Sequence, residues 1–338
     1  MDWKDLRKCE LRLNFTRSLL TDYIGHLYTS SGRIQMASKS SIFLRQAATL
    51  ALSDYKLPTL TAYRLGVMLF DLYLAGEIHG KKIDVRNPLP ERRHYTQVLQ
   101  FLLSYGVLNS MRGFPSGAFY TLIGRSEPTA PELICAVDPF AYLSHLSAMA
   151  IHGLTDRIPH TLFVSSPSPQ QWRSAANAQM RKDLGDRLKD YLEAGFPPLL
   201  RTRFDKVLGQ PVQLTQSSHL GAFKKLEPNG VKVSTIGRTF LDMLREADLC
   251  GGIQHVLDVY KQHAKSYLPL IVGEIDQHGT DIDKVRAGYV LEELCGLQIE
   301  TLTAWVKAAK RGGSRKLVPK NPYSSTFSKK WCLSLNTD

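Results

Sequence analysis

Apolar side chains recur at helical spacing in three consecutive segments of the first third of the chain. The first segment covers residues 41–52. In the second, four apolar residues occupy positions i, i+3, i+4 and i+7: Leu65, Met68, Leu69 and Leu72. In the third, the same four positions hold Tyr95, Val98, Leu99 and Leu102. Because this spacing places side chains on one face of a helix, the pattern predicts three amphipathic helices.

A segment typical of a β-hairpin follows the third helix. Its arms are residues 107–112 and 118–123, and its tip reads Gly-Phe-Pro-Ser-Gly. Gly106 stands where a helix commonly ends on a left-handed residue. Three helices followed by a glycine-containing hairpin are typical of a winged helix-turn-helix, and we predict that fold for residues 40–125.

The polar face of the third helix is a candidate DNA-reading surface. Six residues make up this face and the entry to the helix: Arg92, Arg93, His94, Thr96, Gln97 and Gln100. The major groove of DNA admits a helix that offers such hydrogen-bonding groups to bases and phosphates. In the hairpin, we expect Arg112 and Ser116 to contact phosphate or the minor groove. The alternative is an ordinary helix with a solvated face.

The rest of the chain mixes strand and helix patterns. Residues 125–132 have the composition of a linker, with two prolines and no periodicity. Short apolar runs predict strands at 133–137, 161–165, 199–204, 211–215, 231–234 and 331–335. Longer patterns predict helices at 140–152, 170–194, 253–260 and 284–295. The fold class is therefore predicted to be α+β: a helical extension (1–39), the winged helix (40–125) and a mixed α/β domain (133–338).

Charge is distributed unevenly along the chain. The net charge is +12, with +8 in residues 1–125, −3 in residues 126–304 and +7 in residues 305–338. A basic segment that also carries a DNA-binding pattern favours double-stranded DNA as a partner. The basic tail, residues 307–330, could neutralise further phosphates, meet an acidic partner protein or remain a mobile, solvated segment.

Several classes of protein are not favoured. No apolar run approaches the roughly 18 residues of a membrane span, and no apolar core follows the first residues as in a secretory signal. None of the five cysteines stands in a C-x-x-C pair: Cys9, Cys135, Cys250, Cys295 and Cys332. Scattered thiols of this kind fit a reducing compartment and argue against structural zinc. We predict a cytoplasmic protein without a membrane partner.

Candidate catalytic residues are few. The best set for a metal-dependent nuclease is a run of four carboxylates and a lysine: Glu274, Asp276, Asp281, Asp283 and Lys284. No strand order supports it, and no phosphate-binding, serine-hydrolase or zinc-protease motif occurs. His145 and His152 lie seven residues apart and are expected to be packed histidines on one helix. We predict that the chain is not an enzyme and holds neither a cofactor nor a metal.

Three stretches of the second domain carry a pattern found in a known family. The first is YLSHLSAMAIHGLT at residues 142–155 with the strand at 161–164, and the second is VSTIGRTFLDML at 233–244, continuing to 253. The third covers residues 284–292, with Trp331 and Asn336 near the end. Over about residues 133–336 the chain resembles the AbiEi family, the antitoxins of type IV toxin–antitoxin (abortive infection) systems. Where that family has a glutamate before the arginine of the second stretch, this chain has Gly237.

The resemblance implies a specific role in phage defence. Such proteins repress their own operon by binding inverted repeats in the promoter through the N-terminal domain. They also counter a nucleotidyltransferase-like toxin through the C-terminal domain, with or without direct contact. The sequence is therefore interpreted as a DNA-binding autorepressor and antitoxin. The alternatives are a nuclease targeted by its winged helix and a DNA-binding regulator of a defence locus without a toxin.

The residues of the second stretch have a structural interpretation of their own. Leu241, Leu244 and Leu249 have the spacing of a helix core. Asp242 lies four residues after Arg238 and can accept its hydrogen bonds, an i,i+4 pair worth a few tenths of a kcal/mol. We expect these residues to stabilise the domain rather than to perform chemistry.

Overall fold

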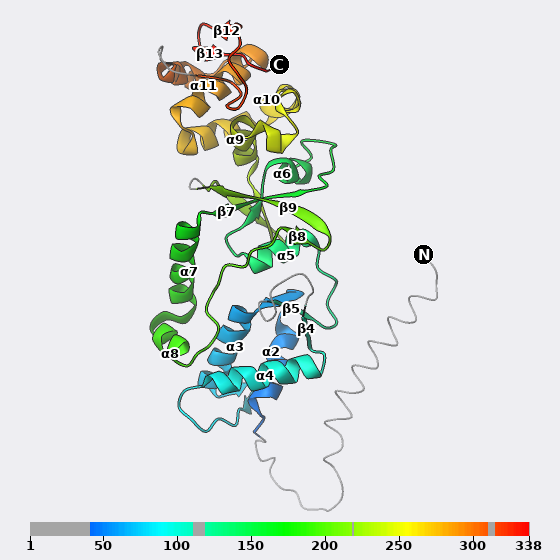
Figure 1. Cartoon of the computed structure of the whole chain (residues 1–338). Coiled ribbons are helices and arrows are strands. Elements are labelled where there is room, and N and C mark those ends of the chain that lie inside the picture. The colour runs from blue at the N-terminus through cyan, green and yellow to red at the C-terminus, as the bar shows by residue number, and fades with distance from the viewer. Residues whose placement is uncertain (1–40, 111–118, 218–219, 310–314, 338) are drawn as a thin grey trace, which may run out of the picture. The chain divides into compact units, whose positions relative to one another are not determined.

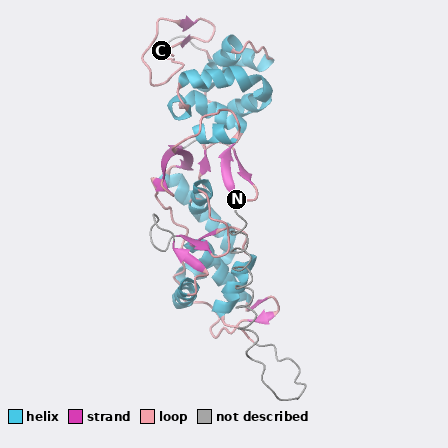
Figure 2. Ribbon diagram, turned by 90° about the vertical axis from the view of Figure 1, so that its right-hand side faces the viewer, coloured by secondary structure: helices cyan, strands magenta, loops and turns pink. Residues whose placement is uncertain are grey.

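The elements at the start of the described chain follow from the three helical patterns (Figures 1 and 2). The computed structural model describes residues 41–110, 119–217, 220–309 and 315–337. The predicted extension 1–39 and the hairpin residues Arg112 and Ser116 lie outside the described residues. The first elements are α2 (Leu44–Asp54), β1 (Thr59–Thr61), α3 (Ala62–Ala75), β2 (Glu77–Ile78), β3 (Lys81–Lys82), α4 (Arg92–Ser104), β4 (Leu108–Ser110) and β5 (Phe119–Leu122).

Local signals set the ends of these helices. The hydroxyl of Thr61 accepts the backbone N–H of Arg64 at 3.2 Å and caps α3. Gly106 adopts φ +67° directly after α4, as expected for a residue in the left-handed region. The strands β1, β5 and β4 form an antiparallel three-stranded sheet in that order, with Leu60 opposite Tyr120. The strand β1 was not predicted, because three residues are too few to show a period.

The segment after the hairpin differs from the prediction. Residues 133–137 were predicted as a strand but belong to helix α5 (Ala130–Val137). Pro131 stands in its first turn, and the backbone N–H of Thr129 donates to the Glu132 carboxylate at 2.6 Å. These helix-start signals lie in the stretch interpreted as a linker, and they outweigh the apolar run that follows.

A mixed six-stranded sheet occupies the middle of the described chain. Its strands in spatial order are β10 (Phe223–Leu226), β11 (Val231–Ser234), β6 (Tyr142–Leu143), β7 (Leu162–Pro167), β9 (Gln210–Ser217) and β8 (Lys206–Val207). The pairs β11–β6 and β7–β9 are parallel and the others antiparallel. The helix predicted at 140–152 is shorter, α6 (His145–Ile151), because β6 takes its first part. The strand predicted at 199–204 is absent, since those residues have no regular structure.

Two helices between β7 and β8 pack against α3 and α4. The long polar helix predicted at 170–194 is interrupted at Gly185, giving α7 (Pro169–Leu184), the 3-10 turn η1 (Gly185–Arg187) and α8 (Leu188–Glu193). One apolar cluster joins these elements, and we call it the shared core: it includes Leu65, Phe70, Tyr95, Val98, Leu102, Trp172, Met180, Tyr191 and Phe196. Residues 41–338 accordingly form one compact unit.

The C-terminal third is mainly helical. Its elements are α9 (Ile236–Arg245), η2 (Ala247–Cys250), α10 (Ile253–His278), α11 (Asp281–Tyr289), η3 (Val290–Leu294), α12 (Glu300–Trp305), η4 (Val306–Ala308), β12 (Phe327–Ser328) and β13 (Leu333–Ser334). A second apolar cluster, which includes Phe240, Val256, Tyr260 and Trp331, fills its interior. No helix of the described residues is long and apolar enough to span a bilayer. With these helices and the mixed sheet, the described chain has the predicted α+β fold class.

Candidate functional site

The helix α4 presents one apolar and one polar face. Tyr95, Val98 and Leu102 are buried in the shared core. The opposite face is exposed and carries Arg92, Arg93, Thr96, Gln97 and Gln100. The helical period predicted this division correctly, because a 3.6-residue repeat separates the two faces. The side chains that can hydrogen-bond to another molecule are thus held on a rigid helix at the surface.

The start of α4 is fixed by a local hydrogen bond. The backbone N–H of Glu91 donates to His94 Nδ1 at 2.8 Å, and the His94 ring lies 5.0 Å from the ring of Tyr73 on α3. This half-buried histidine therefore orients the first turn of the helix. Arg93 Nη2 lies 3.1 Å from Glu91 Oε1, and both side chains are exposed. Because such surface pairs contribute about 0–1 kcal/mol, Arg93 can exchange this carboxylate for a stronger acceptor.

The connection after α8 supports Arg92. Gly195 adopts φ +74°, and a Cβ placed on it would lie 3.4 Å from Arg92 Cβ and Cδ. The aliphatic stem of Arg92 therefore lies against the backbone at Gly195, whereas its residue as a whole remains exposed. Contact between α4 and a segment about 100 residues later has no signal in the sequence, because it depends on tertiary packing.

Further contacts hold α3 and α4 against α7 and α8. The Tyr63 hydroxyl donates to Asp183 Oδ2 at 2.9 Å, and Arg187 Nη1 lies 2.6 Å from Asp71 Oδ1. Burial and the hydrogen bond to Asp183 raise the pKa of Tyr63 above its usual range, so the hydroxyl remains a donor at neutral pH. The polar face of α4 is thus supported by more than its own three-helix module.

The two arms of the predicted hairpin are present as strands. The strands β4 and β5 pair antiparallel, with Ser110 opposite Tyr120. The tip itself, with Arg112 and Ser116, lies outside the described residues, so its predicted role stays a prediction. Beyond the hairpin, Arg125 Nη2 donates to the carbonyls of Ser53 at 3.0 Å and Tyr55 at 2.6 Å. This arginine stabilises the end of α2.

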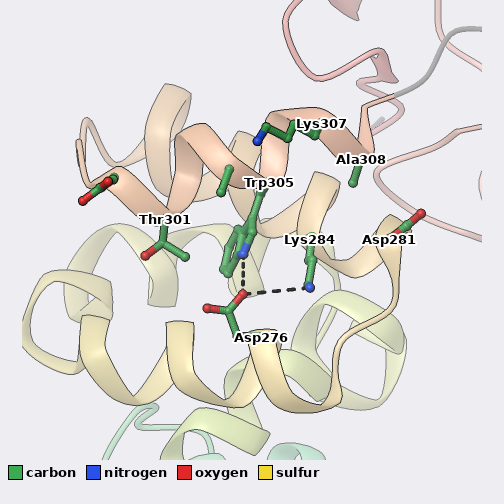
Figure 3. A pocket seen from close by; sticks show the side chains of 9 residues that line it. Asp276, Asp281, Lys284, Thr301, Trp305, Lys307 and Ala308 are labelled. Carbon is green, nitrogen blue, oxygen red and sulfur yellow. Dashed lines mark hydrogen bonds and ion pairs between the residues drawn. The ribbon is translucent and has the colours of Figure 1, made fainter.

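The carboxylates considered for a nuclease lie in different surroundings. Asp276 accepts the Trp305 indole N–H at 2.6 Å and lies 3.9 Å from Lys284 Nζ, in a pocket of about 580 Å³ (Figure 3). Asp281 also lines this pocket. Asp283 is buried and accepts Arg245 Nη2 at 2.7 Å, and Glu274 is buried elsewhere. Among the described residues, no group of three or more His, Cys, Asp or Glu could hold a metal ion.

The predicted pair in the second resemblance stretch, Arg238 and Asp242, is present and buried. Arg238 Nε lies 2.9 Å from Asp242 Oδ1, and the two side chains are 4% and 5% exposed. Burial raises the pKa of Asp242, and Arg238 lowers it by less. A Cβ on Gly237 would lie 2.2 Å from the Leu270 carbonyl oxygen, so the backbone of α10 excludes a side chain there. This close approach accounts for glycine at position 237.

The two histidines of α6 and its cap are packed, as predicted. His145 Nε2 lies 2.8 Å from Glu246 Oε2, and its Nδ1 lies 2.8 Å from Ser144 Oγ. His152 Nε2 donates to the Ser234 carbonyl at 2.7 Å. Burial lowers the pKa of His152 and so favours its neutral form. Both side chains connect α6 to its neighbours.

Comparison with known proteins gives a distant structural similarity and no match in sequence. No protein-family model matches the chain, and no curated protein matches it. Among solved structures, the chain is similar to the crystal structure of the RV2827C protein from Mycobacterium tuberculosis, with a TM-score of 0.43 and 13% sequence identity. The match covers 89% of this chain and 94% of that chain.

Proposed function

We propose that this chain binds double-stranded DNA through a winged helix within residues 40–125 and regulates transcription. The observation that carries the proposal is the exposed polar face of α4, on a helix whose other face is buried. The order α2, β1, α3, β2, β3, α4, β4, β5, with an antiparallel sheet in the order β1-β5-β4, supports the winged-helix assignment. In helix-turn-helix proteins, the reading helix lies in the major groove and contacts base edges.

The dimensions of α4 suit this role. The helix has 13 residues and is therefore about 20 Å long. Arg93, Thr96, Gln97 and Gln100 follow the helical repeat and form one stripe about 10 Å long. A stripe of that length faces about three base pairs in the major groove. Arginine pairs well with guanine and glutamine with adenine, so Arg93 and Gln97 are the proposed base-reading residues.

The proposed biological role extends the DNA-binding function. From the AbiEi resemblance, we propose that the chain represses its own promoter at inverted repeats and counters a nucleotidyltransferase-like toxin. If a nucleotidyltransferase gene lies next to the gene for this chain, expressing that gene with and without the chain and measuring growth tests the antitoxin role. Rescue of growth supports the antitoxin role, whereas an unchanged arrest favours a DNA-binding regulator without a toxin.

The DNA-binding proposal is tested by competition between promoter DNA and scrambled DNA. Arg93→Ala and Gln97→Ala should each weaken promoter binding by about 1–3 kcal/mol and reduce the preference over scrambled DNA. Arg173→Ala on α7 and Gln262→Ala on α10 are matched controls, because both residues are exposed on helices outside the module. If the preference is unchanged in the α4 variants, then α4 is not the reading helix.

A further inference from the structure

The last described segment, residues 315–337, is basic. It contains five Lys and Arg residues and no Asp or Glu. It overlaps the predicted basic tail, residues 307–330, for which the sequence left three interpretations open, one of them a mobile segment. Residues 315–337 belong to a folded region that contains the β12–β13 hairpin (Figure 1).

Buried side chains hold this segment in place. Trp331 is fully buried, its indole N–H donates to Glu292 Oε2 at 3.0 Å, and a Cβ on Gly288 would lie 2.1 Å from its ring. The Asn336 side chain accepts the Val318 N–H and donates to the Val318 carbonyl, both at 2.9 Å. The segment therefore presents its outward side chains in a fixed arrangement.

Two aromatic rings and a lysine share the outer face of this segment. Tyr323 is 54% exposed and Phe327 is 53% exposed. Phe327 lies opposite Ser334 in the hairpin, and Lys316 forms a bridge to the same Ser334 from the other side. Side chains directly opposite one another in a ladder project from the same face. Lys316 Nζ donates to the Asn321 carbonyl at 2.7 Å and lies 5.5 Å from the centroid of the Tyr323 ring, so this ring lies beside a cation.

The same segment carries further cations. Lys329 is exposed, and Lys320 is 2.9 Å from Asp248 with its side chain 72% exposed. Lys330 pairs with Glu292. Exposed pairs of this kind contribute little to stability, so a phosphate can replace the carboxylate of Asp248. The exposed hydroxyl residues Ser325 and Thr326 lie between the two rings in the sequence.

We propose that this segment, through Lys316, Lys320, Tyr323, Phe327 and Lys329, binds single-stranded nucleic acid. Exposed rings next to lysines are the combination that binds unpaired bases, which stack on the rings while lysines neutralise the phosphates. Duplex DNA fits this surface less well, because its base faces are stacked on one another and cannot contact the rings. An acidic peptide would pair with the lysines but would leave the rings without a stacking partner. The site is independent of α4 and goes beyond the proposed function of that helix.

The test is fluorescence anisotropy of the full chain with a fluorescein-labelled oligothymidine of 15 nucleotides. Tyr323→Leu and Phe327→Leu should each weaken binding about tenfold, because leucine keeps apolar bulk but cannot stack. Tyr323→Phe should bind as the unmodified protein does. Lys316→Gln should reduce the salt dependence by about 0.7 in the log–log slope. Phe223→Leu, a half-exposed ring on β10, is the matched control and should have no effect.

The outcomes separate this proposal from its alternatives. An Arg93→Ala, Gln97→Ala double variant should lose promoter preference and keep oligothymidine binding. Oligothymidine binding that disappears in that double variant overturns the proposal, since α4 would then be the site. Unchanged binding in both leucine variants overturns it as well. Binding to phosphatidylserine vesicles that the leucine variants retain, without oligothymidine binding, would instead identify a membrane-facing surface. Thermal melting of each variant establishes that it is folded.

Discussion

Gly66 provides a sharp test of how the shared core holds α3. It lies within α3, and a Cβ placed on it would be 2.4 Å from the Tyr191 hydroxyl oxygen and 3.1 Å from Pro197 Cδ. Tyr191 is fully buried, and its hydroxyl donates to the Pro197 carbonyl at 2.7 Å. The hydroxyl cannot move away from a methyl group without losing this hydrogen bond. We therefore expect Gly66→Ala to destabilise the protein.

The expected size combines three effects. An extra methyl group in a packed core costs about 1–3 kcal/mol, and the lost hydrogen bond costs about 1 kcal/mol. Alanine favours the helical conformation over glycine by about 1 kcal/mol, which offsets part of this cost. The net free energy of unfolding should fall by about 1–3 kcal/mol, which corresponds to a Tm lower by about 2–6 °C.

A second background isolates the cause. Tyr191→Phe removes the hydroxyl and leaves the ring carbon Cζ, which lies 3.4 Å from the added Cβ. In that background, Gly66→Ala should cost less than 1 kcal/mol, because only Pro197 Cδ remains close. The measurement is urea and thermal unfolding of the four proteins in a double-mutant cycle. An equal cost of Gly66→Ala in both backgrounds would refute the steric argument.

Three further predictions follow from single contacts. Gly288→Ala should displace the Trp331 ring and lower Tm by several degrees, with a red shift of tryptophan fluorescence that Gly273→Ala, where a Cβ meets nothing within 4 Å, should not produce. Burial raises the pKa of Asp283, but hydrogen bonds from Arg245 and Thr280 outweigh burial, and the net pKa is lowered. The stabilisation by Asp283 is therefore present above about pH 4 and is lost as the pH falls through the folded pKa. Asp283→Asn should cost about 3 kcal/mol at pH 7 and flatten the acid limb of the profile of stability against pH. Gly195→Ala should cost about 1 kcal/mol through its φ of +74° and leave promoter binding unchanged, because its Cβ would meet Arg92 only at van der Waals distance, 3.4 Å; a folded variant with weakened promoter binding would contradict this.

Local periodicity was sufficient to predict the helices within residues 40–125. The apolar stripe of α4 identified which side chains are buried and which are exposed, and Gly106 marked the end of the helix. These features depend on neighbours within four residues, and such information is present in a short stretch of sequence. The strand–helix confusion at residues 133–137 has the same origin, because a five-residue apolar run fits both. The capping signal at Thr129 and Glu132 was the stronger evidence.

Features that depend on distant residues could not be predicted. The Arg238–Asp242 spacing was recognised, but not its burial, which follows from the packing of α9 against α10. The support of Arg92 by Gly195 joins residues about 100 positions apart, and no local pattern reports it. The face formed by Tyr323, Phe327 and Lys316 likewise depends on strand register, which places three separated residues together.

The shared core has a consequence for synthesis on the ribosome. The faces of α3 and α4 that contain Leu65, Phe70 and Tyr95 are completed by residues that begin at Trp172 and end near Leu199. At about 5–20 residues per second, the roughly 100 intervening residues take about 5–20 s to synthesise. During that interval the nascent chain carries an incomplete apolar surface. The first module to emerge is therefore among the later ones to reach its final packing, and the helices α7 and α8 set the time at which it does so.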